Sequence, residues 1–165
     1  MLAALLLLSG CGYRVGSRSD LLPRTVQTIA VPAWENLTHR YRLNERMPAA
    51  ISRELISRTR YAVVPDAGQA DAVLNGVVSN YMVFPTVSDP TTGRAAGLQI
   101  IVAMHITLTE RASGKVLFSR PGLEFRQRYE IAMDQTKYFE ESDLAIDRLS
   151  RDVARSVVSA VLESF

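Results

Sequence analysis

Residues 98–109, LQIIVAMHITLT, alternate in polarity more clearly than any other stretch of the chain. All of its even-numbered positions are apolar, whereas Gln99, His105, Thr107 and Thr109 occupy odd-numbered positions. Because successive side chains of a strand point to opposite faces of its sheet, this pattern predicts a strand with one buried face. The sheet that contains this strand therefore needs other elements to cover one of its faces.

Two further long strands are predicted on either side of this stretch. Residues 72–84, AVLNGVVSNYMVF, are apolar at odd and even positions alike, which predicts a central strand. Residues 115–129 form the third strand, whose apolar positions change from even to odd around Pro121-Gly122. A β-bulge at Pro121-Gly122 would return both halves to the same face.

The connection between the first two long strands, residues 85–97 (PTVSDPTTGRAAG), is predicted to be a loop of 13 residues. This is longer than a hairpin requires, and loops of such length are often functional. Arg94 is its only basic residue and lies near the expected tip.

The remaining elements complete a recognisable order. Short strands are predicted within 25–34 and at 61–64, and a helix is predicted near 46–59 with Pro48 in its first turn. A final helix is predicted near 142–164, with Ser142 as its N-cap. The order β-α-β-β-β-β-α predicts an α/β (α+β) fold, a two-layer sandwich. Its mixed sheet of four to five strands would carry both helices on one face.

Length and composition are those of one ordinary globular domain. The chain has 165 residues, of which 47% are hydrophobic and 22% charged. Its formal net charge is only +2, too small for a strong polyanion binder, so no nucleic acid is expected as a partner.

The start of the chain carries a targeting signal. Residues 2–8, LAALLLL, are too few to span a bilayer, which takes about 20 residues, and have the length of the apolar region of a signal peptide. Leu8-Ser9-Gly10-Cys11 resembles a bacterial lipobox, whose cysteine receives a diacylglycerol before the leader is cut away. Cys11 is also the only cysteine of the chain, which excludes a disulfide within it.

The lipobox divides the chain into three predicted parts. These are a lipoprotein signal peptide (1–10), a lipidated N-terminal tether (11–24) and a single domain (25–165). Acyl chains such as palmitate on Cys11 would anchor the protein to a membrane without spanning it. Gly12 after the cysteine favours the outer membrane, by resemblance to other lipoproteins. The alternative is an ordinary signal peptide, or a frayed apolar N-terminus, that carries a chance cysteine.

Residues that could support catalysis are scarce. His39 and His105 have no partner at metal-ligand spacing, and no nucleophile, P-loop or dinucleotide motif is present. We therefore expect no catalytic residue, no metal site and no cofactor. The acidic residues 140, 141, 143 and 147 are interpreted as complementing the dipole at the start of the last helix, with a calcium or acid–base site as the alternative.

The charges are unevenly distributed along the chain. Residues 111–128 carry a net +4, and residues 140–163 carry a net −3. This polarity suits anionic head groups or an oppositely charged partner. A solvated sheet edge protected by charge explains the basic stretch equally well.

Several short motifs, in order, resemble the LptE family of lipopolysaccharide-assembly lipoproteins. Each is weak alone, but together they extend over nearly all of the mature chain. They are Cys11-Gly12-Tyr13-Arg14, Thr28-Ile29-Ala30-Val31-Pro32, Trp34-Glu35-Asn36, Tyr61-Ala62-Val63-Val64, the segment 70–76 (ADAVLNG) and the two helices.

This resemblance implies the same fold and a non-catalytic role at the periplasmic side of the outer membrane. Members of the family plug LptD, a large β-barrel, and help it to insert lipopolysaccharide into the outer leaflet. If direct lipopolysaccharide binding carries over, the phosphates of lipid A would meet Arg94, Arg111, Lys115 and Arg120, which are chosen on charge. The alternative is a periplasmic accessory or ligand-binding lipoprotein of another envelope transport system, which would need a deep apolar pocket.

Overall fold

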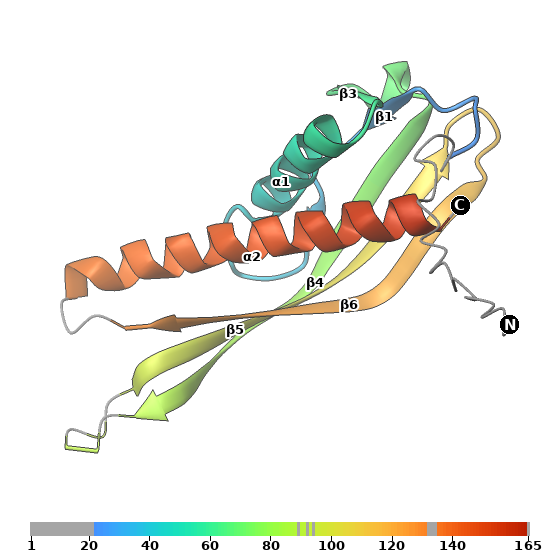
Figure 1. The fold of residues 1–165 in the computed structure, drawn as a ribbon. Helices are drawn as coiled ribbons and strands as arrows, with labels where there is room; N and C mark the ends of the chain where they lie inside the picture. Colours follow the sequence, from blue (N-terminus) through green and yellow to red (C-terminus); the bar gives the residue numbers. More distant parts are fainter. Residues whose placement is uncertain (1–21, 89, 92, 94, 132–134, 165) are drawn as a thin grey trace, which may run out of the picture.

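The computed structural model describes residues 22–88, 90, 91, 93, 95–131 and 135–164 (Figure 1). Its helices and strands follow one another along the chain. They are β1 (Thr28–Ala30), β2 (Glu35–Asn36), α1 (Leu43–Arg58), β3 (Ala62–Val64), the 3₁₀ helix η1 (Ala67–Gln69), β4 (Ala72–Ser88), β5 (Ala95–Glu110), β6 (Val116–Glu130) and α2 (Gln135–Glu163).

The strands form one mixed sheet in the order β3-β1-β4-β5-β6. The two-residue strand β2 pairs with β4, on the same edge as β1. Pairing is parallel among β3, β1, β2 and β4, and antiparallel from β4 through β5 to β6. Both helices cover the same face of this sheet (Figure 1). The predicted two-layer α+β fold is therefore confirmed, and β2 makes the sheet larger than expected.

The central strand β5 behaves as its alternating pattern predicts. Its even-numbered residues from Leu98 to Leu108 are between 0% and 8% exposed and face the helices, whereas its odd-numbered residues are only partly buried. Helix α2 covers them with a stripe that includes Ile146, Leu149 and Val153. Burying each such aliphatic side chain contributes about 1.5–3 kcal/mol, so this interface dominates the stability of the domain.

The predicted bulge in β6 is confirmed. Met104 of β5 pairs with Leu123, but Ile106 pairs with Arg120, so β6 has one residue more than β5 in this interval. Gly122 accommodates the extra residue with a φ of 67°, in the left-handed region that glycine tolerates best. The bulge brings even-numbered Phe118 and odd-numbered Leu123 to the helix-covered face.

Two predictions about the region of β4 are wrong. Strand β4 is central only as far as Val78, because β1 and β2 pair with it up to that residue and β5 alone pairs with it beyond. The 13-residue loop is also wrong, since β4 continues to Ser88 and β5 begins at Ala95. Pro85 pairs with Leu98 within the ladder. An edge strand tolerates proline because its missing N–H need not serve a neighbour.

Helix α1 begins at Leu43, earlier than predicted, so Pro48 lies beyond its first turn. A proline there leaves the carbonyl of the residue four positions before it without its usual donor. The backbone N–H of Trp34 replaces that donor, at 2.9 Å from the carbonyl oxygen of Asn44. The residue just before β2 thus supplies the hydrogen bond that Pro48 cannot donate.

Helix α2 also begins earlier than predicted, at Gln135, so Ser142 is not its N-cap. Ser142 lies well inside the helix and is only 6% exposed. The sequence between Gln135 and Ser142 lacks a clear apolar periodicity, which is why the prediction placed the helix start too late. Among the described residues, no helix is long and apolar enough to cross a bilayer.

Candidate functional surfaces

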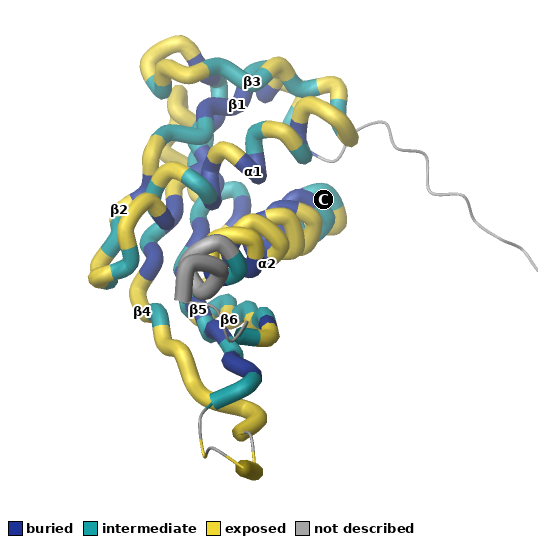
Figure 2. Tube along the Cα trace, turned by 90° about the vertical axis from the view of Figure 1, so that its left-hand side faces the viewer, coloured by how far each residue is buried: buried dark blue, intermediate teal, exposed yellow. Residues whose placement is uncertain are grey.

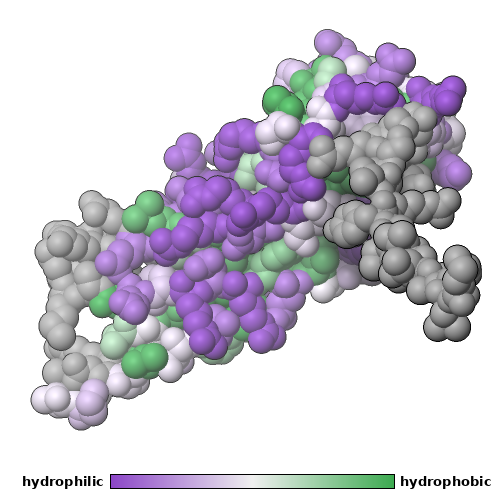
Figure 3. Space-filling view, in the orientation of Figure 1, coloured by the Kyte–Doolittle hydropathy of each residue, from purple (hydrophilic) through white to green (hydrophobic). Residues whose placement is uncertain are grey.

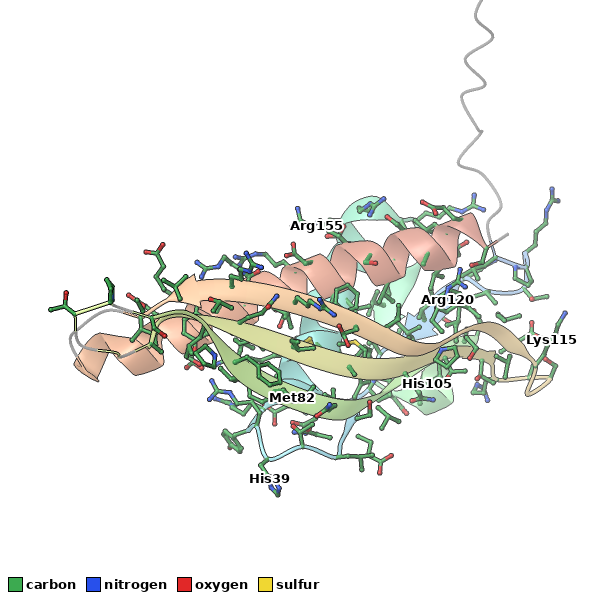
Figure 4. The ribbon with its side chains drawn as sticks, turned by 90° about the horizontal axis from the view of Figure 1, so that it is seen from below. His39, Met82, His105, Lys115, Arg120 and Arg155 are labelled. Carbon is green, nitrogen blue, oxygen red and sulfur yellow. The ribbon has the colours of Figure 1, made fainter. Side chains whose placement is uncertain are left out.

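In the part of the chain that the structure describes, histidine, cysteine and carboxylate side chains do not gather into a metal site. No group of three or more histidine, cysteine, aspartate or glutamate residues that could hold a metal ion occurs in the described part of the chain. His39 and His105 lie apart, on the loop after β2 and on β5 (Figure 4). The candidate functional features of the described residues are therefore surfaces.

The acidic residues of α2 have a structural role that differs from the predicted one. Asp143 accepts from Arg40 at 2.9 Å and lies 3.4 Å from Arg46, and Asp147 lies 3.3 Å from Arg46. Since α2 begins at Gln135, these carboxylates lie beyond its first turn and do not complement its dipole. They instead link α2 to α1 and to the loop that precedes it, so the helix-terminus interpretation is wrong for both.

Arg40 joins three parts of the fold. Its guanidinium contacts Asp143 and Ser142 of α2 and lies over the ring of Tyr81 in β4, 5.9 Å from its centroid. Its Nε is buried without a hydrogen-bond partner. The loop between β2 and α1 is thereby held against α2 and β4, beside the point where β2 ends.

A second carboxylate, that of Asp71, fastens β1 to the start of β4. Its Oδ2 accepts hydrogen bonds from the backbone N–H groups of Gln27 and Thr28 and from the Thr28 hydroxyl, at 2.8–2.9 Å. The hydrogen bond from the Gln27 N–H, followed by those from Thr28, lowers the pKa of Asp71 below its ordinary value of 3.8. The ionised form is therefore the one that the fold stabilises.

The basic residues proposed for lipid A do not form one cluster. Arg111 and Lys115 lie in and after the β5–β6 turn, and Arg111 donates from Nε to the carbonyl oxygen of Ala70 at 2.7 Å. Arg120 lies farther along β6, its guanidinium 5.6 Å from the centre of the Phe118 ring. Figure 4 shows Lys115 at the end of the hairpin and Arg120 nearer the middle of the sheet.

Arg94 and Cys11 lie outside the described residues, so the roles predicted for both remain predictions. Ala95, next to Arg94 in the sequence, begins β5, whose other end leads into the turn with Arg111. Sixteen residues of strand separate these ends. At about 3.3 Å per residue this is roughly 50 Å, so one small head group cannot bridge them.

Ion pairs of two acidic residues in α2 and of one basic residue in β6 do not join these two elements to each other. Asp143 and Asp147 face the arginines that precede and begin α1, as described above. On the side seen in Figure 3, hydrophilic side chains cover much of α2, whereas hydrophilic and hydrophobic side chains both appear in the region of β6. Arg126 of β6 pairs with Glu124 of the same strand, at 2.6 Å, rather than with α2.

A surface that the sequence analysis missed is the part of β4 beyond Val78. Most of its residues are exposed, and Figure 2 shows this part at the border of the molecule. Among the residues whose burial the structure describes, six of the nine exposed large hydrophobic side chains lie in it or in the loop after β2. They are Leu37, Tyr41, Met82, Val83, Phe84 and Val87. The signal was present in the sequence as 17 uncharged residues in succession, 72–88, of which we interpreted 72–84 as a central strand and 85–88 as part of a loop.

The pocket required by the ligand-binding alternative is not evident on the described surface. A pocket of about 490 Å³ lies where the chain enters the domain, open to solvent. It is lined by Leu22, Pro23, Arg24, Val26, Gln27, Arg60 and Tyr61. Leu22, which falls within the predicted tether, is 4% exposed and belongs to the core. The pocket is a mixed polar and apolar entry site rather than a deep apolar cavity.

Comparison with known proteins identifies relatives of this fold. The family model described as "LptE: Lipopolysaccharide-assembly" matches residues 26–161. No curated protein sequence matches the chain significantly.

Three solved structures are similar at low sequence identity. The rare lipoprotein B of Shewanella oneidensis has a TM-score of 0.56 at 14% identity, covering 83% of this chain and 95% of that one. An uncharacterized lipoprotein B of Nitrosomonas europaea has a TM-score of 0.56 at 14% identity, over 84% of this chain and 88% of that one. A putative lipoprotein of Caulobacter crescentus CB15 has a TM-score of 0.55 at 12% identity, over 79% and 89%. These likenesses concern the fold.

Proposed function

The chain belongs to the LptE family of lipopolysaccharide-assembly proteins, and we propose that it is a non-catalytic, lipid-anchored subunit that plugs an LptD-type β-barrel. In this role it helps to assemble the barrel and assists the insertion of lipopolysaccharide into the outer leaflet. The observation that carries the proposal is the family match over residues 26–161, which extends from just before β1 to near the end of α2.

The surfaces of the domain support a plug rather than an enzyme. One face of the sheet has no helix of the described residues over it, and its side chains include Gln99, Thr107 and Arg126, which suit a water-lined barrel interior. The other face is closed by two helices into a single core. A rigid core with a polar outer face can occupy a barrel without a site for chemistry.

The anchor is the second part of the proposal. Acylated Cys11 would hold the domain at the periplasmic side of the outer membrane. Eleven residues, 11–21, precede Leu22, which is fixed in the core. Fully extended they would reach about 36–40 Å, so the anchored end of the domain stays close to the membrane surface.

Lipopolysaccharide contact is the third part. Lipid A phosphates would meet Arg111 and Lys115 at the β5–β6 turn and Arg120 on β6 as two separate contacts, with Arg94 as a further candidate. Arginine and lysine both suit phosphate, and arginine does so with a planar fork.

The experiment that tests the proposal is depletion of the protein from its own cells. The fraction of lipopolysaccharide that is accessible to a labelling enzyme outside intact cells would be measured over time. We expect this fraction to fall as the protein is depleted and to recover with the wild-type gene, but not with Cys11→Ala. An unchanged surface fraction after full depletion would contradict a role in lipopolysaccharide assembly.

A further inference from the structure

The outer edge of β4 beyond Val78 continues a ladder that is already in use. Glu35 and Asn36 of β2 pair with Val77 and Val78, and the N–H of Leu37 then donates to the carbonyl oxygen of Val78 at 3.0 Å. Beyond Val78, no strand of the described residues pairs with this edge. We call the outward-facing backbone of residues 79–84 of β4 the free edge. Pro85 limits it, because its nitrogen carries no hydrogen to donate.

β2 stops where it does because Trp34 fixes its position. The Trp34 ring packs directly over Gly76, where an added Cβ would lie only 2.3 Å from Trp34 Cδ2. The backbone N–H of Trp34 also donates a hydrogen bond to the carbonyl oxygen of Asn44 in α1. These contacts hold β2 against the first half of β4, after which the chain departs toward α1 and leaves the second half uncovered.

The free edge begins with a register shift at Ser79 and ends at Pro85, but it lacks the charges that the other long edge of the sheet carries. Strand β6 carries four charged residues from Arg120 to Arg128, and its bulge at Gly122 interrupts the edge. Charges and bulges of this kind prevent the addition of foreign strands. On β4 no charged residue occurs between Asp71 and Asp89. An uncharged edge in a protein whose other long edge is charged indicates that the uncharged edge is covered in the working state.

Apolar side chains flank the free edge on both faces of the sheet. Met82, opposite Ile101, lies on the open face and is 37% exposed, whereas Val83, opposite Ile100, lies on the helix-covered face and is 38% exposed. Phe84 is 45% exposed. Exposed apolar residues that gather in one place mark interaction sites. A strand added at this edge would place its own side chains beside them.

We propose that the free edge of β4 accepts an extended, uncharged segment of the β-barrel subunit as an added strand. Backbone hydrogen bonds would supply the affinity, and apolar side chains beside Met82 and Val83 would supply specificity. Six residues are a typical strand length. The inference rests on the proposed function, which supplies the barrel subunit as the partner.

A second copy of the chain fits this edge less well. The register of β4 shifts between Val78 and Asn80, and Pro85 follows the free edge. In a self-paired dimer both interruptions would occur in both strands, so that the shared ladder would be short. A partner strand without these interruptions can use the whole free edge.

The test is amide hydrogen exchange of the full lipidated protein, alone and in the detergent-solubilised complex with its barrel. We expect peptides that contain residues 79–84 to exchange about tenfold or more slowly in the complex, because strand addition protects backbone N–H groups. Peptides from the outer edge of β6 should not change comparably. Met82→Lys, which adds a charge at the free edge, should reduce the amount of co-purified barrel severalfold. Val116→Lys, at a residue 52% exposed at the start of β6, is the matched control.

The outcomes separate this inference from the function on which it rests. If the barrel co-purifies but residues 79–84 exchange as in the free protein, the added strand is wrong and the proposed function stands. If no barrel co-purifies, the added strand and the proposed function are both wrong. Protection of residues 79–84 in the isolated protein that increases with its concentration would assign the edge to a second copy and overturn the inference.

Discussion

At the scale of single residues, Asp71 shows how one side chain fastens two distant segments. Its carboxylate satisfies two backbone donors and a hydroxyl of the β1 strand region, while Arg111 provides a further favourable charge. The sequence does not reveal this role, because Asp71 lies in a stretch that is typical of an ordinary turn. Only the parallel pairing of β1 with β4 brings Gln27 and Thr28 to it.

The pH dependence of stability follows from the lowered pKa of Asp71. A carboxyl whose pKa is lower in the folded than in the unfolded protein stabilises the fold above its ordinary value of 3.8. That contribution is lost as the pH falls below 3.8 and through the lowered folded value. We expect Asp71→Asn to reduce the thermal midpoint at about pH 7. The margin, which is the difference in midpoint between the wild type and the variant, should narrow in this acidic range.

Differential scanning fluorimetry across this pH range measures the margin. Asp66→Asn is the control, since it removes a carboxylate of the same turn that accepts one backbone hydrogen bond, from Gly68. It should lower the midpoint less. A margin for Asp71→Asn that stays constant from neutral pH to below 3.8 would contradict the assigned role of the ionised carboxylate.

At the scale of elements, the periodicity of apolar residues predicted strands best where burial of one face alone decides the pattern. The alternation of 98–109 identified β5 and its buried face, because burial on one side alone decides that pattern. The phase change around Pro121-Gly122 likewise identified the bulge. Long regular strands with one covered face can therefore be found from sequence alone.

Prediction was wrong where tertiary contacts decide the boundaries of elements. Nothing local shows that the N–H of Trp34 will compensate for Pro48, so the start of α1 was placed too late. The apolar residues of β4 look alike on both sides of Val78, although one half is covered by neighbours and the other is exposed. A run of apolar residues indicates burial or binding, and the sequence does not distinguish the two.

The bulge gives a clean test at this scale. A Cβ at Gly122 would meet no atom within 4 Å, so a substitution there is opposed only by the backbone conformation. We expect Gly122→Ala to cost about 1–2 kcal/mol in the free energy of unfolding, measured with urea. Gly122→Asn should cost less, because asparagine adopts positive φ more readily. An alanine variant as stable as the wild type would show that the bulge relaxes to another conformation.

At the scale of the whole molecule, the basic residues belong to different places along an elongated sheet. Charge reversal at Lys115 and at Arg120 should each weaken binding to lipopolysaccharide at low salt, by about two- to tenfold. Because the two contacts are separate, the effects on binding free energy should add in the double variant. Arg53→Glu, on the exposed face of α1, is the control for the change in net charge.

Equilibrium binding to purified lipopolysaccharide in detergent provides the measurement. A double variant that binds no more weakly than either single variant would indicate one shared site. Binding that is unchanged in all variants would remove lipopolysaccharide contact from the β5–β6 hairpin.

The candidate surfaces were predicted only in part, because the sequence does not show where residues lie in the whole molecule. The sequence allowed the anchor to be proposed at Cys11 and the basic residues to be chosen on charge. Charge alone does not show that Arg111 is occupied by the carbonyl of Ala70, or that strand β5 separates the ends of the sheet. The family resemblance, by contrast, was predictable because its motifs occur in order along the whole chain.

The central claim is that this chain is the lipoprotein subunit of a lipopolysaccharide-assembly barrel. The measurement that tests it most directly is a mild-detergent purification of the C-terminally tagged, lipidated protein from its own outer membrane, with the co-purifying proteins quantified by mass spectrometry. We expect one large β-barrel protein in a near one-to-one ratio. Recovery of the protein alone, or with inner-membrane transporter subunits, would contradict it and favour an accessory lipoprotein of another transport system.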